Sequence, residues 1–382
     1  MNELYELSVL RNLMENPVFS AVLKGEIKSG KFLHDLFDAN AQDNLTAYLY
    51  DLVKYDDNAF SRACAKNPAA VSPYLKKAFA RDLRIVGEAV SSIGTDGRFC
   101  LGDADGRVGL WDDEAIERLS AFYERNEYGK YARYFAFRFT DRELVPISSP
   151  STVSLGDLKG YEREKEEVRD NFENFAEGLP FSDMLLYGDR GTGKSSTVHA
   201  MLNLYRTKKI RLVEIAKEDI LSLPALKAKL AVEPVKFVIF IDDFSLSEDD
   251  GRVSTLKASL QGSMEGLSDN VMIVATSNRR HIVEENFDTR QNSIHTGDSE
   301  QELLSLADRF GKTVLFSQTT KEQYRNIVIE LAKDASLKTS PDELSFLAER
   351  WALYAGGRSP RRARQFIDYC IACEKKNKKI EV

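Results

Sequence analysis

A glycine-rich loop placed directly after a short apolar run, residues 184–187, is the feature that most restricts how this chain folds. The loop follows the pattern G-x-x-x-x-G-K-[ST] and consists of Gly188, Asp189, Arg190, Gly191, Thr192, Gly193, Lys194, Ser195 and Ser196. The glycines let backbone amides approach phosphate oxygens that a side chain would hold away. Lys194 adds positive charge at those oxygens, and Ser195 offers a hydroxyl ligand to Mg²⁺. Because a helix beginning near Gly193 would point its positive end at the anion, the pattern predicts a strand–loop–helix unit that binds nucleotide phosphates.

A second apolar run, Lys236 to Ile241, ends in the adjacent carboxylates Asp242 and Asp243. A nearly continuous apolar run is typical of a central parallel strand that is covered on both faces. Ligands of open α/β sheets bind at the carboxyl ends of the strands. We therefore expect Asp242 to hold Mg²⁺, directly or through water, and Asp243 to orient or deprotonate the attacking water.

Three more polar residues follow predicted elements. Asn278 comes after a strand over residues 270–276, where its amide would reach a γ-phosphate and the attacking water, although Asn also favours caps and turns. Arg309 lies at the end of a predicted amphipathic helix closed by Gly311, where the usual place of an arginine is a solvated or salt-bridged surface position. Arg361 belongs to a cluster of four arginines at the start of a helix.

The order of these parts resembles that of the AAA+ ATPases. More narrowly, the segments LYGDRGTGKSS, ATSNRRH, LADRFG and SPRRARQF resemble the bacterial AAA+ family DUF815, and the resemblance covers about residues 154–368. It implies that Asn278 is the sensor-1 residue and that Arg309 is an arginine finger acting on the γ-phosphate of a neighbouring subunit. It also implies that Arg361 is the sensor-2 arginine on a small helical lid.

The resemblance extends to the nucleotide and to partners. The stretch 155–162, which includes Tyr161, resembles the linker that precedes an AAA+ core and packs on adenine. The cofactors implied are ATP and Mg²⁺, and a shared site implies a homo-oligomer. The motifs carry no information about the target, which we leave open as a protein or a nucleic acid.

One position departs from the AAA+ pattern. Most AAA+ ATPases carry Glu after the metal-binding Asp, and this chain carries Asp243. The shorter side chain holds its carboxylate farther from the water, and a misplacement of about 1 Å costs on the order of 10²-fold in rate. Either another group compensates, with Glu248 as the nearby candidate, or hydrolysis is slow.

The composition is that of an ordinary globular protein of two or three domains, with 382 residues of which 43% are hydrophobic and 30% charged. The net charge of −7 argues against a generally basic nucleic-acid binder. The first residues lack the pattern of a signal peptide, and no apolar run approaches the roughly 20 residues that cross a bilayer. We therefore expect a cytoplasmic protein without a membrane partner.

The cysteines and histidines form no evident chemical site. Cys370 and Cys373 have C-x-x-C spacing, but no second pair stands at zinc-like spacing, so we expect one of them to face a helical core. The histidines are scattered along the chain. An acidic turn at residues 103–106 faintly resembles a calcium loop, but it lacks the first ligand position.

The predicted fold class is α/β: an AAA+ P-loop parallel sheet covered on both faces, with a C-terminal helical lid and a mainly helical N-terminal domain. We expect domain boundaries that give a helical domain with a β-hairpin at 1–147, the ATPase core at 148–317 and the lid at 318–382. A Ser- and Pro-containing stretch at residues 148–152 supports the first boundary. Alternating strands and helices between the boundaries predict the parallel sheet.

The leading functional interpretation is an Mg-ATP-dependent oligomeric ATPase that assembles or remodels a macromolecular target. The alternative is a slow-hydrolysing, ATP-gated scaffold or loader that docks a partner. A threading unfoldase is less favoured, because residues 217–236 contain no aromatic–glycine loop that would grip a polypeptide. A nucleoside kinase is disfavoured further, because nothing resembles an acceptor pocket with its own base.

Overall fold

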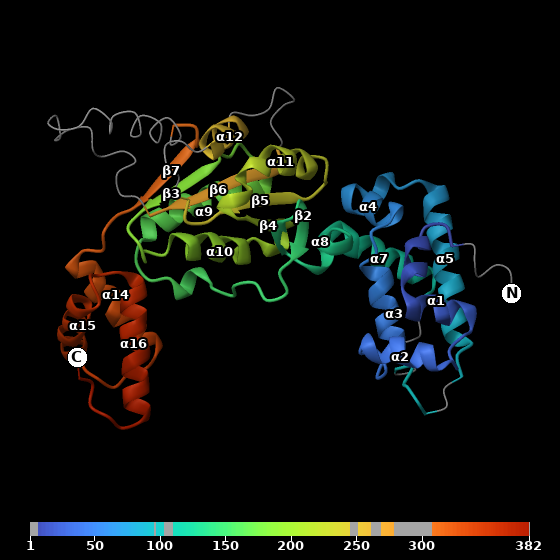
Figure 1. Ribbon diagram of the computed structural model, residues 1–382, viewed down its shortest axis with the longest axis horizontal. Coiled ribbons are helices and arrows are strands. Elements are labelled where there is room, and N and C mark those ends of the chain that lie inside the picture. The colour runs from blue at the N-terminus through green and yellow to red at the C-terminus, as the bar shows by residue number, and fades with distance from the viewer. Residues whose placement is uncertain are drawn as a thin grey trace. The chain divides into compact units, whose positions relative to one another are not determined.

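The computed structural model describes residues 7–94, 97–102, 110–244, 251–260, 269–278 and 308–381 (Figure 1). The chain divides into two compact units, Met1–Phe135 and Ala136–Val382. The expected boundary after residue 147 thus differs from the observed division after Phe135. Among the described helices, none is both long and apolar enough to cross a bilayer.

The N-terminal unit is helical in its described residues. Its helices and 3₁₀ turns are η2 (Arg11–Glu15), α1 (Pro17–Lys24), α2 (Gly30–Asp38), α3 (Leu45–Lys54), α4 (Ala59–Lys66), η3 (Pro68–Ala70), α5 (Pro73–Ser91), α7 (Asp113–Asn126) and α8 (Gly129–Arg133). The apolar side of α5 faces the core of this unit, where Phe79 stacks on Phe60 with ring centroids 4.1 Å apart. The edge of Tyr123 from α7 meets the same Phe60 ring.

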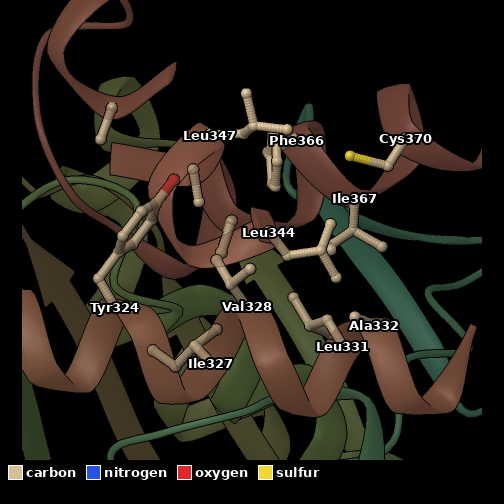
Figure 2. Packing of buried hydrophobic residues seen from close by; sticks show 13 residues of the cluster. Tyr324, Ile327, Val328, Leu331, Ala332, Leu344, Leu347, Phe366, Ile367 and Cys370 are labelled. Carbon is tan, nitrogen blue, oxygen red and sulfur yellow. The ribbon is translucent and has the colours of Figure 1, made fainter. Parts of the chain in front are cut away.

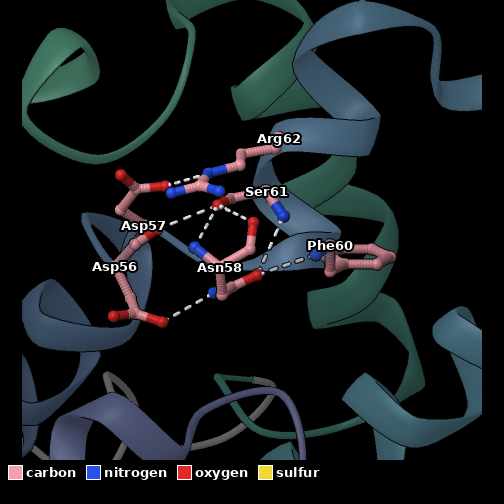
Figure 3. Close-up of polar contacts among 6 residues, drawn as sticks. All are labelled: Asp56, Asp57, Asn58, Phe60, Ser61 and Arg62. Carbon is pink, nitrogen blue, oxygen red and sulfur yellow. Dashed lines mark hydrogen bonds and ion pairs between the residues drawn. The ribbon is translucent and has the colours of Figure 1, made fainter.

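A polar network starts helix α4 (Figure 3). The Asn58 side chain accepts hydrogen bonds from the backbone amides of Phe60 and Ser61, which are otherwise unpaired at a helix N-terminus. Its amide nitrogen donates to Asp56 over 2.8 Å. Burial raises the pKa of Asp56 to about 6, even though this hydrogen bond favours the charged form.

Within the described residues of the second unit, seven strands form one sheet in the order β2-β1-β4-β5-β6-β3-β7. The strands are β1 (Ala136–Thr140), β2 (Glu143–Pro146), β3 (Met184–Gly188), β4 (Ile210–Ile215), β5 (Lys236–Ile241), β6 (Val271–Ser277) and β7 (Lys312–Phe316). Strands β1 and β2 form the predicted hairpin. Because β1 pairs in parallel with β4, the hairpin extends the core sheet, which is why the compact unit begins at Ala136.

Helices cover both faces of this sheet (Figure 1). Helices α9 (Glu162–Glu177) and α10 (Lys194–Leu204) pack against each other, as do α11 (Leu223–Ala231) and α12 (Gly251–Leu260). Shorter 3₁₀ turns, η4 (Leu155–Asp157), η5 (Arg206–Lys208) and η6 (Lys217–Ser222), connect the elements. Strands β3 and β6 are buried along their whole length, as expected for central parallel strands.

The chain ends in a three-helix lid formed by α14 (Lys321–Asp334), α15 (Pro341–Tyr354) and α16 (Pro360–Lys375). Figure 2 shows its core, in which Tyr324 and Val328 of α14 lie near Leu344 of α15 and Phe366 of α16. Cys370 and Cys373 are both buried there, and burial raises the pKa of Cys370 to about 12. A thiol so hard to ionise is a poor nucleophile, so Cys370 contributes to the packing of the lid core. With these helices the predicted fold class is confirmed.

Candidate nucleotide-binding site

The glycine-rich loop connects β3 to α10, as the sequence predicts. Gly188 ends the strand with φ +121°, and a Cβ atom there would lie 2.2 Å from the carbonyl oxygen of Phe316 on β7. No other residue fits at this position, because both the backbone conformation and the neighbouring strand exclude a side chain. The chain then turns sharply into α10, whose N-terminal amides lie at the loop.

Lys194 lies at the first turn of α10 and is buried, with 5% of its surface exposed. Its ammonium group donates to the carbonyl oxygens of Gly188 and Asp189, at 3.0 and 2.7 Å, and to Oδ1 of Asn278 at 3.0 Å. Burial lowers the pKa of Lys194 to about 8, and the nearby carboxylates of Asp189, Asp243 and Asp242 oppose part of that shift. The lysine is thus held ready at the loop by neutral oxygens that phosphate oxygens can replace.

The two predicted metal ligands meet at the carboxyl end of β5. Ser195 donates from Oγ to Oδ1 of Asp242 over 2.5 Å. The same carboxylate oxygen accepts from Oγ1 of Thr276 at 2.6 Å and from the backbone amide of Asp243 at 3.1 Å. A serine hydroxyl beside a carboxylate is the kind of oxygen ligand set that Mg²⁺ prefers. Sequence reasoning missed Thr276, because a β-branched residue in an apolar run is simply a good strand former.

Asn278, just beyond β6, links the lysine to the second carboxylate. Its Oδ1 accepts from Lys194, and its amide nitrogen donates to Oδ1 of Asp243. Asp243 has φ +48°, a left-handed conformation that Asp tolerates better than most residues. The structure therefore brings the predicted sensor-1 residue, the phosphate-loop lysine and the predicted base into one hydrogen-bonded chain.

A cavity of about 660 Å³ extends from the loop to the lid. It is lined by loop residues 190–196, by Asp242, Asp243 and Asn278, and by Tyr161. Its volume lies within the range of small-ligand and cofactor sites. The Tyr161 ring packs near Phe316 with centroids 5.5 Å apart, and its hydroxyl donates to the carbonyl of Ser317 over 2.6 Å. Tyr161 thus shapes one wall of the cavity, with its hydroxyl already bonded to protein.

The lid contributes two arginines to the same cavity. Arg361, at the start of α16, donates from its backbone amide to the carbonyl oxygen of Gly191 over 3.2 Å. Arg364, one turn later, donates from Nη2 to the carbonyl oxygen of Asp157 over 3.0 Å. Sequence reasoning singled out Arg361 and missed Arg364, although both belong to the same arginine cluster.

Arg309 does not line this cavity. It precedes β7, and register pairs the first residue of β7, Lys312, with Met184 and the last residue, Phe316, with Gly188. Arg309 therefore lies at the amino edge of the sheet, whereas its own phosphate loop lies at the carboxyl edge. The five residues of β7 between these edges span roughly 16 Å, which is more than an arginine side chain reaches. The proposed compensating residue Glu248 falls outside the described residues.

Comparison with known proteins assigns the chain to a family. A family model for a protein of unknown function, DUF815, matches residues 132–374, which is more than half of the chain. The chain belongs to the DUF815 family. This DUF815 match begins four residues before β1, so it includes the hairpin that joins the core sheet.

Two curated proteins are similar to part of the DUF815 chain. Proteasome-activating nucleotidase 2 of Haloferax volcanii is 31% identical over 36% of this chain and 40% of its own length. An AAA-ATPase of Arabidopsis thaliana is 33% identical over 28% of this chain and 21% of its own length. The chain thus spans less than half of either relative. Together with the fold, these matches place the DUF815 chain among the AAA+ P-loop ATPases.

Solved structures overlap with the DUF815 chain more loosely. The Thermotoga maritima RuvB Holliday junction branch migration motor is 17% identical, covers 59% of this chain and 67% of its own, and has a TM-score of 0.40. The FIGL-1 AAA domain in complex with ADP is 19% identical, covers 60% of this chain and 76% of its own, and has a TM-score of 0.41.

Proposed function

We propose that this chain binds Mg-ATP in the cavity beside its glycine-rich loop and hydrolyses it. The observation that carries the proposal is the hydrogen bond between Ser195 and Asp242, because it places a hydroxyl and a carboxylate side by side next to the loop lysine. This donor set fits Mg²⁺, whose preferred ligands in proteins are oxygens. When bound, the metal ion would neutralise charge on the phosphates.

The remaining site residues have separate roles in this proposal. Lys194 binds the β- and γ-phosphates, and Asp243 orients or deprotonates the attacking water. Asn278 positions both of them, since its amide already contacts the lysine and the carboxylate. Arg361 and Tyr161 border the nucleotide from the lid and from the linker.

We propose further that the active site is shared between subunits of a homo-oligomer. The position of Arg309 at the amino edge of the sheet supports this, because the side chain is too far from its own loop to contact the same nucleotide. An arginine that acts on a neighbour's γ-phosphate offsets the charge that develops there. The macromolecular target, protein or nucleic acid, is left open.

A second candidate function is a slow, ATP-gated scaffold or loader. The specific observation that favours it is the hydrogen bond from Asn278 to Asp243. This bond restricts the rotation of a short carboxylate that would otherwise turn toward the attacking water. Such a protein would assemble or dock its partner upon binding ATP and hydrolyse the nucleotide only to reset.

Steady-state phosphate release by the full chain, in Mg²⁺ and in EDTA, tests the proposal. We expect Mg²⁺-dependent release whose rate per subunit rises with protein concentration. Sustained ATP turnover without a partner favours the ATPase that assembles or remodels a target. Tight ATP binding with almost no turnover favours the scaffold or loader. Absence of ATP binding would overturn both.

A further inference from the structure

Thr276 is a buried threonine at the centre of the candidate site, and only 2% of its surface is exposed. It is the sixth residue of β6, a strand that is buried along its whole length. A buried hydroxyl costs free energy unless it is hydrogen-bonded, and valine has the same shape without that cost. Packing alone therefore does not account for a threonine at this position.

The Thr276 hydroxyl uses both of its hydrogen-bonding capacities on the acidic pair. It donates to Oδ1 of Asp242 over 2.6 Å and accepts from the backbone amide of Asp243 over 3.0 Å. The backbone of Thr276 adds a third contact, since its carbonyl oxygen accepts from the amide of Phe244 over 2.6 Å. One residue of β6 thus fixes the whole turn that follows β5.

The geometry of the turn makes this anchoring consequential. Asp243 has φ +48°, a conformation that costs free energy for residues other than glycine. The hydrogen bond from its amide to Thr276 offsets part of that cost. Without it, the turn would relax and both carboxylates would change direction together, since they are adjacent in the chain.

We propose that Thr276 is a positioning residue that orients Asp242 toward the metal site and holds Asp243 in its left-handed conformation. The inference rests on the proposed Mg-ATP function. It extends that function, because it assigns the alignment of the two carboxylates to a side chain to which the sequence analysis gave no role. Mutating an outer residue that orients a metal-binding carboxylate typically lowers metal affinity or activity by roughly 10- to 100-fold.

The test compares Thr276→Val with Thr276→Ser in the full chain. Valine keeps the shape and removes the hydroxyl, whereas serine keeps the hydroxyl and removes a methyl group. Thr46→Val is the matched control, because Thr46 is also 2% exposed but lies in the N-terminal unit. Two quantities are measured for each protein: the dissociation constant of a fluorescent ATP analogue in Mg²⁺ and in EDTA, and the Mg²⁺ concentration that gives half-maximal phosphate release.

For Thr276→Val we expect unchanged binding in EDTA, loss of the Mg²⁺-dependent gain in affinity, and a half-maximal Mg²⁺ concentration about 10-fold higher or more. Thr276→Ser should return both values to within about 3-fold of the parent, and Thr46→Val should leave them unchanged. A purely structural defect would weaken binding in EDTA as well and would not be rescued by serine, and that result overturns the inference. Parental Mg²⁺ dependence in a folded Thr276→Val protein also overturns it. If the parent itself binds no Mg-ATP, the proposed function has failed instead.

Discussion

The Ser195 hydroxyl donates a hydrogen bond of 2.5 Å to the Asp242 carboxylate, although the two residues lie 47 positions apart in the chain. The serine lies in the first turn of α10, after β3, and the aspartate follows β5. Strand β6 separates β3 from β5 in the sheet, so the contact closes over the carboxyl end of β6. This is where the remaining polar side chains of the site, those of Thr276 and Asn278, are found.

Replacing Lys194 with Ala is expected to abolish ATP binding while the fold remains intact. The lysine is the main side-chain cation at the loop, and backbone amides alone would not hold a tetra-anion tightly. Equilibrium binding of a fluorescent ATP analogue, with circular dichroism as the folding check, measures this. If a folded Lys194→Ala protein binds the ATP analogue with the affinity of the parent, the assignment of the phosphate loop is wrong.

ATP binding is expected to take up protons near pH 8. Burial holds the pKa of Lys194 at about 8 without nucleotide, and phosphate charge would raise it. At pH 8 roughly half a proton per site should be taken up by this lysine, and almost none at pH 6.5. Titration calorimetry in buffers of different ionisation enthalpy reports the uptake, and Lys194→Ala is expected to lose the signal together with binding. The lowered pKa also means that this lysine's contribution to folding stability rises with pH between about 8 and 10.5.

Substitutions of the adjacent carboxylates Asp242 and Asp243 are expected to block different steps of ATP hydrolysis. Asp242→Asn should lose Mg²⁺-dependent activity, because Asp242 receives the Ser195 hydroxyl at the metal site. Asp243→Asn should keep ATP binding and trap the bound state, because the proposed role of Asp243 is to orient or deprotonate the attacking water. Nucleotide binding and phosphate release are measured on the same preparations. If Asp243→Asn hydrolyses ATP at the parental rate, the base lies elsewhere.

Asp243→Glu tests whether the short side chain limits the rate. Glutamate moves the carboxylate about one C–C bond farther from the backbone, toward the water, and a shift of ~1 Å is worth on the order of 10²-fold. If Asp243→Glu hydrolyses ATP faster than the parent, the scaffold or loader is supported, because the short aspartate then limits the rate of the parent protein. An unchanged or slower enzyme shows that the surrounding residues already suit aspartate.

Arg309→Ala should retain ATP binding and lose most hydrolysis, since related arginine fingers are worth about 10³- to 10⁵-fold in rate. Mixing it with Lys194→Ala gives the sharper measurement, because neighbouring subunits would combine an intact loop with an intact finger and recover some activity. The control is each variant alone at the same total concentration. An inactive mixture whose subunits demonstrably co-assemble would show that Arg309 does not act between subunits.

The start of α4 is expected to be more stable in mild acid. Burial raises the folded pKa of Asp56 from 3.8 to about 6, so the folded state binds more protons between these values and stability falls as pH rises through this window. The effect is at most roughly 3 kcal/mol. Hydrogen exchange of α4 amides in the full chain at pH 5 and pH 7, corrected for intrinsic rates, measures it. Asp56→Asn should flatten the difference, whereas Asp57→Asn should only reduce it, because it removes the smaller charge contribution and leaves the burial of Asp56 in place.

Local patterns in the sequence were sufficient for the strand–loop–helix around Lys194 and for the acidic end of β5. These features need only neighbouring residues, because glycine spacing and an apolar run dictate backbone shape within one segment. The helical lid was instead implied by the resemblance to the AAA+ ATPases. The fold class followed from the alternation of strands and helices.

Relationships between segments were not available from the sequence. The hairpin Ala136–Pro146 looked like part of the N-terminal domain, but its pairing with β4 places it in the core sheet. Thr276 looked like an ordinary strand residue, and Arg364 like one arginine among several. Both residues lie in segments that resemble the family, but their partners lie far along the chain, so the segments alone do not show which contacts they make.

The sequence by itself therefore determined which residues we propose for phosphate and metal binding, and the tertiary structure decided how they are arranged. Strand order and register depend on packing between segments far apart in the chain, because each strand buries its side chains against neighbours that only the folded state supplies. That register brings Thr276 beneath the acidic pair and sets Arg309 at the opposite edge of the sheet from Gly188.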